Sequence, residues 1–239
     1  MKILIIIPAY NEEASIVGVI ENLKKNYPQY DYVIINDGSK DCTSSICHKR
    51  GYEVIDLPIN LGLAGAFQTG LKYAYLKDYD RAMQLDADGQ HLPEYIDPLL
   101  KKMEQGYDVV IGSRFVTEKK PKTMRMLGSN LISWAIRVTT GAEISDPTSG
   151  MRLFNREMIR EFANNINYGP EPDTISFLLK QGVRVGEVQV QMAERVAGES
   201  YLNWTRSIIY MTKMLLSIMV LQNFRKRNLK QSDSVKEEK

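Results

Sequence analysis

The sequence is poor in cysteine, since its 239 residues include only Cys42 and Cys47. Two cysteines within one predicted helix cannot build a disulfide framework, so a reducing, cytosolic setting is the simpler interpretation. Excess charge of one sign is also small: the formal net charge is +2, and no basic patch with interleaved aromatic residues precedes the C-terminus. This balance argues against a dedicated nucleic-acid-binding protein.

Long hydrophobic runs are scarce as well. The apolar run at residues 3–7 is too short for a signal peptide. Residues 207–221 are almost wholly apolar, but the stretch is shorter than the roughly 20 residues that a membrane span needs, and Lys213 interrupts it. We therefore predict an amphipathic helix that lies in the membrane interface, with Trp204 and Tyr210 at the level of the lipid headgroups.

A basic cluster follows this apolar stretch and would meet anionic lipids at the cytoplasmic face of the cell membrane. It consists of Arg225, Lys226, Arg227 and Lys230. The alternative is a helix packed in the core or in a dimer, followed by a solvated basic end. The first interpretation makes residues 202–231 a membrane-interfacial segment, and the polar residues 232–239 a disordered tail.

Residues 1–201 have the pattern of one α/β domain. Hydrophobic residues make up 44% of the chain and charged residues 25%, which is ordinary for a globular protein. Helices alternate with strands through residue 113, as in a parallel sheet. Strands are expected at 3–7, 32–36, 52–56, 81–85, 108–112 and 183–190. Helices are expected at 12–25 with Asn11 as cap, from the Asp41 cap to residue 50, at 62–76, at 124–140, and from a cap within 169–173 to residue 180.

Two carboxylates, Asp86 and Asp88, follow the predicted strand 81–85. Side chains at positions i and i+2 of a strand end point to the same side, so both carboxylates can face one hard cation. Mg²⁺ and Mn²⁺ take few protein oxygens and complete their coordination with water and substrate phosphates. The spacing therefore indicates a metal held against a diphosphate; an ordinary polar turn is the alternative.

Two further predicted strands end in polar loops. Residues 3–7 run toward Glu12, and residues 32–36 run into Asp37. Ligands of open α/β sheets bind outside the carboxyl ends of the strands. Glu12, Asp37 and the Asp86/Asp88 pair are thus expected to line one acidic crevice.

Together, the segments PAYNEE (8–13), NDGSKD (36–41), LDADGQH (85–91) and GSR (112–114) closely resemble the family-2 glycosyltransferases with a GT-A fold. The later segments SDPTSGMR (145–152) and ERVAGES (194–200) narrow the resemblance to the dolichyl- or polyprenyl-phosphate sugar synthase branch. The resemblance covers about residues 1–201, with its motifs in the right order. It implies a mainly parallel, Rossmann-like sheet flanked by helices.

The resemblance also implies roles for individual residues. The ligands of Mg²⁺ or Mn²⁺ would be Asp86, Asp88 and Gln90. The nucleotide sugar would contact Pro8, Tyr10, Glu12, Asp37, Asp86, Ala87, Asp88, Arg114 and Arg195, with Asp37 on the nucleobase. The acceptor phosphate would contact Arg125 and Ser129. The chain departs from the family where Asn36 replaces the first of two aspartates, and where Tyr201 follows Ser200 in place of a lysine, which weakens the case for a cation there.

The implied reaction is inverting transfer of a hexose from a nucleotide diphosphate sugar to polyprenyl (undecaprenyl) phosphate, for cell-surface glycan synthesis. A UDP-sugar is preferred to GDP-mannose on the breadth of the family alone. Candidate catalytic residues are Asp88, Arg114, Arg195 and Asp146. The enzyme would work at the membrane surface alone, with a small membrane protein or as a homo-oligomer.

Two alternatives stay open at this point. If the acceptor is a glycan hydroxyl, a carboxylate must remove its proton, and Asp146 is the candidate base. The structural alternative for Asp146 is a cap of its own turn. The chain could instead be a non-catalytic membrane-associated subunit, against which the intact Asp86, Asp88, Gln90 and Arg114 argue.

Overall fold

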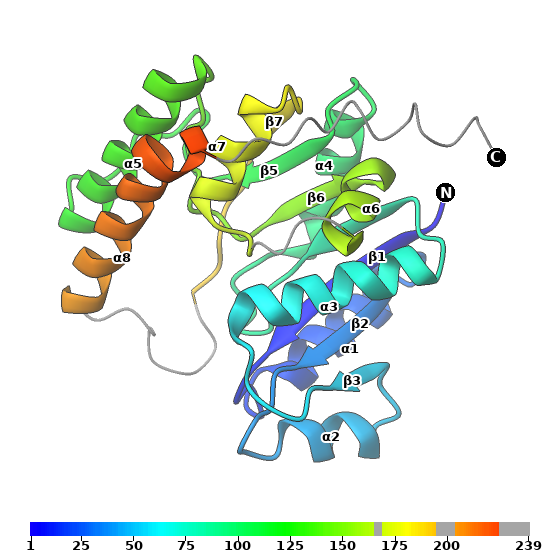
Figure 1. The fold of residues 1–239 in the computed structure, drawn as a ribbon. Coiled ribbons are helices and arrows are strands. Elements are labelled where there is room, and N and C mark those ends of the chain that lie inside the picture. The colour runs from blue at the N-terminus through cyan, green and yellow to red at the C-terminus, as the bar shows by residue number, and fades with distance from the viewer. Residues whose placement is uncertain (165–168, 195–203, 225–239) are drawn as a thin grey trace.

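The computed structural model describes residues 1–164, 169–194 and 204–224, and its centre is a seven-stranded sheet in the order β3-β2-β1-β4-β6-β5-β7 (Figure 1). The strands are β1 (Ile3–Ala9), β2 (Asp31–Asn36), β3 (Val54–Asp56), β4 (Arg81–Gln84), β5 (Val109–Ser113), β6 (Arg152–Asn155) and β7 (Val185–Gln189). Neighbouring strands run parallel except β6, which is antiparallel to both β4 and β5. The expected α/β fold with a mainly parallel sheet is confirmed.

Helices cover both faces of the sheet. They are α1 (Ile16–Asn26), α2 (Thr43–Lys49), α3 (Gly62–Leu76), the 3₁₀ helix η1 (Pro93–Tyr95), α4 (Ile96–Met103), α5 (Met124–Thr140), α6 (Arg156–Asn164), α7 (Pro172–Lys180), α8 (Trp204–Leu216), the π-helix η2 (Ser217–Leu221) and α9 (Gln222–Phe224). Strand β1 has no polar face: Leu4 and Ile6 enter the core beneath α3, whereas Ile5 and Ile7 enter the core beneath α1 and α4. A strand buried on both faces gives the continuous apolar run seen in the sequence.

Close packing of α3 on the sheet depends on a glycine. A Cβ atom at Gly70 would lie 2.3 Å from Cγ2 of Ile6 in β1. Next to this contact, the rings of Phe67, Phe154 and Phe162 join α3, β6 and α6, with centroids 5.4–6.0 Å apart. This cluster anchors β6 and α6, which the sequence pattern did not predict.

One predicted helix start is wrong, and a second is displaced by one residue. Helix α1 begins at Ile16 because residues 12–15 form a turn, in which the Ser15 and Ile16 amides donate to the Glu12 carbonyl oxygen. Asn11 is no cap: its φ is 57° and its side-chain oxygen accepts from the Lys40 amide, so it joins two loops. Helix α2 begins at Thr43, whose amide donates to the Asp41 carboxylate.

The C-terminal helices pack against the domain. Helix α8 lies beside α5, while η2 and α9 contact α7 (Figure 1). A Cβ atom at Gly128 of α5 would lie 1.6 Å from the Met211 sulfur, so the glycine permits this close approach. The basic cluster and the tail lie outside the described residues, and the boundaries at 201 and 231 stay predictions. Within the described part of the chain, no helix has the length and apolar character needed to cross a membrane.

Candidate active site

The predicted site residues follow strands that end at one edge of the sheet. Strands β1, β2, β4 and β5 end there, and antiparallel β6 begins there, with Arg152 in register with Gln84 of β4 and Ile111 of β5. The turn at 145–150 leads directly into Arg152 and therefore reaches the same edge. A Cβ atom at Gly150 would lie 3.5 Å from Oδ2 of Asp86, so this turn contacts the loop that carries Asp86 and Asp88.

Asp86 is held by two neutral side chains. The Gln84 amide donates to Oδ1 over 3.1 Å, and Nε2 of His91 lies 3.5 Å from Oδ2. Nδ1 of His91 accepts from the Asp86 amide at 3.0 Å, so a neutral ring carries its hydrogen on Nε2, toward the carboxylate. The sequence did not reveal His91 as a contact of Asp86; its place in LDADGQH was the only signal.

The predicted metal ligands are an aspartate pair and an amide. Asp88 is buried, and its Oδ1 accepts from the backbone N–H of Gln90 over 3.0 Å. The Asp86 side chain, by contrast, is 35% exposed. No group of three or more His, Cys, Asp or Glu residues suited to a metal occurs in the described residues. Two carboxylates and an amide oxygen nevertheless suit Mg²⁺ or Mn²⁺, which need few protein ligands. The donors from Gln84 and His91 would orient Asp86 as a ligand.

The predicted nucleotide-contacting residues lie along neighbouring strand ends. Pro8 pairs with Ile35 in the sheet, Tyr10 is exposed, and Ala87 is buried beside the carboxylate pair. Asp37 is buried, with Oδ1 accepting from the Leu61 amide over 2.7 Å. Oε2 of Glu12 accepts from the Ser15 hydroxyl over 2.6 Å. Glu12 and Asp37 therefore shape the loops that they occupy, and contact with a nucleotide stays a prediction.

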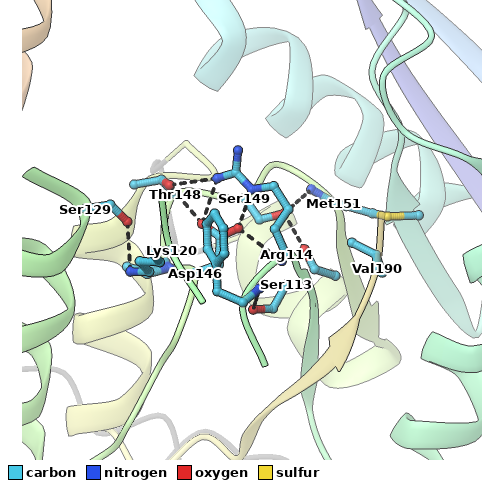
Figure 2. A network of polar contacts seen from close by, with 12 residues as sticks. Ser113, Arg114, Lys120, Ser129, Asp146, Thr148, Ser149, Met151 and Val190 are labelled. Carbon is cyan, nitrogen blue, oxygen red and sulfur yellow. Dashed lines mark hydrogen bonds and ion pairs between the residues drawn. The ribbon is translucent and has the colours of Figure 1, made fainter. Parts of the chain in front are cut away.

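Arg114 and Asp146 form a two-pronged ion pair at this edge (Figure 2). Nε of Arg114 is 2.6 Å from Oδ2, and Nη2 is 2.9 Å from Oδ1. Thr148 also donates to Oδ1 over 3.0 Å. The amides of Ser145 and Asp146 donate to the Glu187 carboxylate of β7 over 2.7 and 2.9 Å. The turn is thus tied by a side chain to Arg114, which directly follows β5, and by its backbone to Glu187 in β7.

Asp146 is fully buried, and its charge is stabilised locally. Burial alone would raise the pKa of its carboxyl, but the hydrogen bonds and positive charge of Arg114 outweigh burial and hold the pKa below 3.8. Such a carboxylate accepts a proton poorly near neutral pH. The geometry therefore favours orientation of Arg114 over general-base chemistry.

Arg152 stabilises the turn at 145–150 through buried hydrogen bonds. Its fully buried guanidinium donates to the carbonyl oxygens of Pro147, Ser149 and Glu171 over 2.9, 3.0 and 3.3 Å. Burial lowers the pKa of Arg152 to about 10. Its role was not predicted, although the residue ends the SDPTSGMR segment, because a buried arginine solvated by carbonyls leaves no periodic signal.

The predicted acceptor-phosphate residues, Arg125 and Ser129, both lie on α5. Ser129 is buried and its hydroxyl is 3.1 Å from Nζ of Lys120, which precedes the helix (Figure 2). The side chain of Arg125 is not described, and Arg195 lies outside the described residues. Lys120 was not among the predicted site residues.

An exposed apolar stripe runs along the other side of α5. It comprises Met124, Leu127, Leu131, Trp134 and Val138, each at least 45% exposed and spaced at helical intervals. Helix α8 and the π-helix η2 contact α5, and exposed apolar residues also occur from α8 to α9: Ile209, Leu216, Met219, Val220, Leu221 and Phe224. We call these two sets the α5–α8 apolar face. Exposed apolar residues gathered on neighbouring helices are typical of an interaction site.

One predicted membrane contact is wrong. The Tyr210 hydroxyl donates to the Glu171 carboxylate, so this tyrosine turns toward α7 rather than toward lipid headgroups. Ser217 donates to Asp173 over 2.7 Å, and Ile218 is fully buried. The helix therefore combines a packed side with an exposed apolar side, and the side chain of Trp204 is not described.

Comparison with known proteins agrees with this arrangement. The model of glycosyl transferase family 2 matches residues 4–162. The undecaprenyl-phosphate mannosyltransferase of Micrococcus luteus is 31% identical over 220 residues, covering 85% of this chain and 88% of the relative. The UDP-N-acetylglucosamine–dolichyl-phosphate N-acetylglucosaminyltransferase of Methanococcus voltae is 30% identical over 213 residues, covering 79% and 84%.

A solved structure shows the same fold. Glucosyl-3-phosphoglycerate synthase from Mycobacterium tuberculosis, in complex with Mn²⁺, uridine diphosphate and phosphoglyceric acid, superposes with a TM-score of 0.66 at 20% identity. The match covers 92% of this chain and 78% of that one.

Proposed function

The chain belongs to glycosyl transferase family 2, and from that premise we propose that it transfers a hexose from a nucleotide diphosphate sugar to polyprenyl phosphate at the cytoplasmic membrane surface. The names of relatives with about 30% identity support a lipid phosphate as the acceptor. The names of these relatives specify different sugars, mannose and N-acetylglucosamine, so the sugar donor of this chain must be identified by experiment. A UDP-sugar is the first donor to test.

One observation carries the proposal: helix α5 borders the candidate site with one side and exposes apolar residues on the other. On the side toward the site, Ser129 is 4% exposed and accepts a hydrogen bond from Lys120. On the other side, Leu131 and Trp134 are 45% and 56% exposed. An acceptor with a phosphate head and a hydrocarbon chain matches both sides. Binding of the α5–α8 apolar face to the bilayer interface would bring the site to the lipid.

The proposed transfer needs no general base. An oxygen of the lipid phosphate attacks the anomeric carbon opposite the nucleotide, and a new carbon–oxygen bond forms. The bond from that carbon to the diphosphate oxygen breaks, and its electron pair leaves with the nucleoside diphosphate, which inverts the configuration. The second pKa of a phosphate monoester is about 6, so the attacking oxygen is anionic at neutral pH. Asp146 then serves as a positioning residue for Arg114.

Asp86, Asp88 and Gln90 would hold Mg²⁺ or Mn²⁺. Such an ion, when bound, supplies positive charge against the charge that develops on the departing diphosphate. Gln84 and His91 would fix the Asp86 carboxylate. Arg114, oriented by Asp146, would contact the phosphates of the donor with its planar guanidinium.

The test is incubation of the full chain with Mn²⁺, undecaprenyl phosphate and a panel of radiolabelled UDP- and GDP-sugars. We expect one donor to yield label that extracts into organic solvent, with inverted anomeric configuration by proton NMR. A retained configuration, or a product formed only on water-soluble glycans, would contradict the proposal.

A further inference from the structure

Lys120 occupies an unusual position for a loop lysine. It precedes α5, and its ammonium group turns back onto the helix, 3.1 Å from Oγ of Ser129 (Figure 2). The same ammonium group is 3.4 Å from Oγ of Ser133. The side chain is partly buried, whereas Lys119 and Lys122 of the same loop are exposed. A long, flexible side chain is thus held in one place and has lost part of its water.

The charge of Lys120 is less compensated than that of neighbouring cations. Arg114 is matched by Asp146, and Arg152 is solvated by three carbonyl oxygens. In the described part of the chain, no carboxylate lies within ion-pair distance of Lys120. Burial lowers the pKa of its ammonium, the more distant charges of Asp146 and Glu187 raise it, and Arg114 lowers it.

The group has the donors that an anion requires. An ammonium carries three hydrogens, and the described residues accept two of them. A hydroxyl that accepts from the ammonium still has its own hydrogen to donate, so Ser129 and Ser133 add two donors. A partly buried cation with neutral partners and spare donors is suited to a phosphate.

We propose that Lys120, together with the hydroxyls of Ser129 and Ser133, binds the phosphate of the lipid acceptor. This assignment rests on the proposed function and adds Lys120 and Ser133 to its acceptor site. The Arg114 guanidinium lies 5.1 Å from the centroid of the Phe115 ring, and the Lys120 ammonium lies 5.6 Å from the same centroid. A donor phosphate at Arg114 and an acceptor phosphate at Lys120 would therefore lie close together, with the lipid chain beside the α5–α8 apolar face.

The experiment compares Lys120→Gln, Lys120→Arg and the matched control Lys122→Gln, using undecaprenyl phosphate in detergent and the donor found active. Losing a hydrogen bond to a charged group predicts a rise of about tenfold or more in KM for the lipid phosphate in Lys120→Gln. We expect KM for the nucleotide sugar and the Tm to stay near wild type. Lys120→Arg should restore most of the lipid affinity, and Lys122→Gln should leave both KM values unchanged.

Other outcomes overturn the assignment. A folded Lys120→Gln variant with an unchanged lipid KM would exclude Lys120 while leaving the proposed function intact. Equal rises in both KM values, or an equal effect of Lys122→Gln, would do the same. If Lys120→Gln does not fold, Ser133→Ala carries the test, with a rise of about threefold expected in the lipid KM alone. A wild-type chain that makes no glycolipid would refute the proposed function and this assignment with it.

Discussion

Replacing Asp146 with asparagine removes the charge that holds Arg114 and keeps the shape of the side chain. Asp146 is fully buried, and the Arg114 side chain is 24% exposed. Breaking a buried ion pair by changing one partner costs about 3–5 kcal/mol. Because Arg114 keeps some contact with water and asparagine keeps one acceptor oxygen, we expect a loss of about 2–3 kcal/mol in the free energy of unfolding. For a chain of this length the Tm should fall by roughly 4–12 °C.

Urea unfolding followed by circular dichroism measures this loss. The matched control is Glu143→Gln, which breaks the pair between Arg137 and Glu143, whose side chains are 66% and 70% exposed. Exposed pairs contribute little, so the control should lose less than about 0.5 kcal/mol. The folded-state pKa of Asp146 lies below 3.8, so its stabilising effect is present above that pH and lost as the pH falls through the folded-state pKa. The gap between wild type and Asp146→Asn should therefore narrow under acid conditions.

Turnover of the same variant separates orientation from base catalysis. With a lipid phosphate acceptor, we expect Asp146→Asn to lose less than about tenfold in kcat, since no proton must be removed. Loss of a general base would reduce the rate by about 10²–10⁴-fold. A variant as stable as wild type would refute the structural reasoning. A folded variant with a loss above a hundredfold would reinstate Asp146 as the base and favour a hydroxyl acceptor.

Three further outcomes are expected. Asp88→Asn should fold normally yet lose more than about a hundredfold in turnover, and EDTA should abolish wild-type activity. Normal turnover of the variant with Mn²⁺ would contradict the metal assignment. Leu131→Gln with Trp134→Gln should reduce co-sedimentation with anionic liposomes, whereas the control Leu76→Gln, at a leucine that is even more exposed, should not. Equal binding of the wild type and both variants would exclude the α5–α8 apolar face as the lipid contact. Because the pKa of Lys120 is lowered, the lipid KM should rise with pH before the ordinary lysine value of 10.5 is reached, and Lys120→Arg should remove that rise; an identical pH profile in both would contradict it.

Elements with strong periodicity were predictable from the sequence. The predicted helices at 62–76 and 124–140 agree with α3 and α5 at both ends, and the strands at 3–7 and 32–36 lie within β1 and β2. These segments have long apolar repeats and turn residues at their ends. By contrast, β6 has four residues, one of them the buried Arg152, and such a segment has no apolar pattern to read.

The site was predictable in its motifs but not in its contacts. Asp86 and Asp88 follow a strand that could be found by its apolar run, so their placement at the sheet edge was expected. The meeting of Arg114 with Asp146 depends on the direction of β6, which brings residues 32 positions apart to one edge. Lys120 shows the same limit, because only folding of its loop onto α5 distinguishes it from Lys119 and Lys122.

The surroundings of the C-terminal helix could also be determined only from three-dimensional contacts. Its apolar sequence is compatible with a packed helix and with an interfacial one, and the structure gives it a packed side and an exposed side. Tyr210 illustrates why sequence was insufficient: its partner, Glu171, is 39 positions away at the start of α7.

The central claim is that the phosphate of a polyprenyl lipid is the acceptor. The most direct test offers the full chain, with Mn²⁺ and the active radiolabelled donor, either undecaprenyl phosphate or undecaprenol, which differ only in that phosphate. We predict organic-extractable glycosylated product from undecaprenyl phosphate and none from undecaprenol. Glycosylation of undecaprenol at an equal or higher rate would contradict the account, because a hydroxyl would then be the nucleophile.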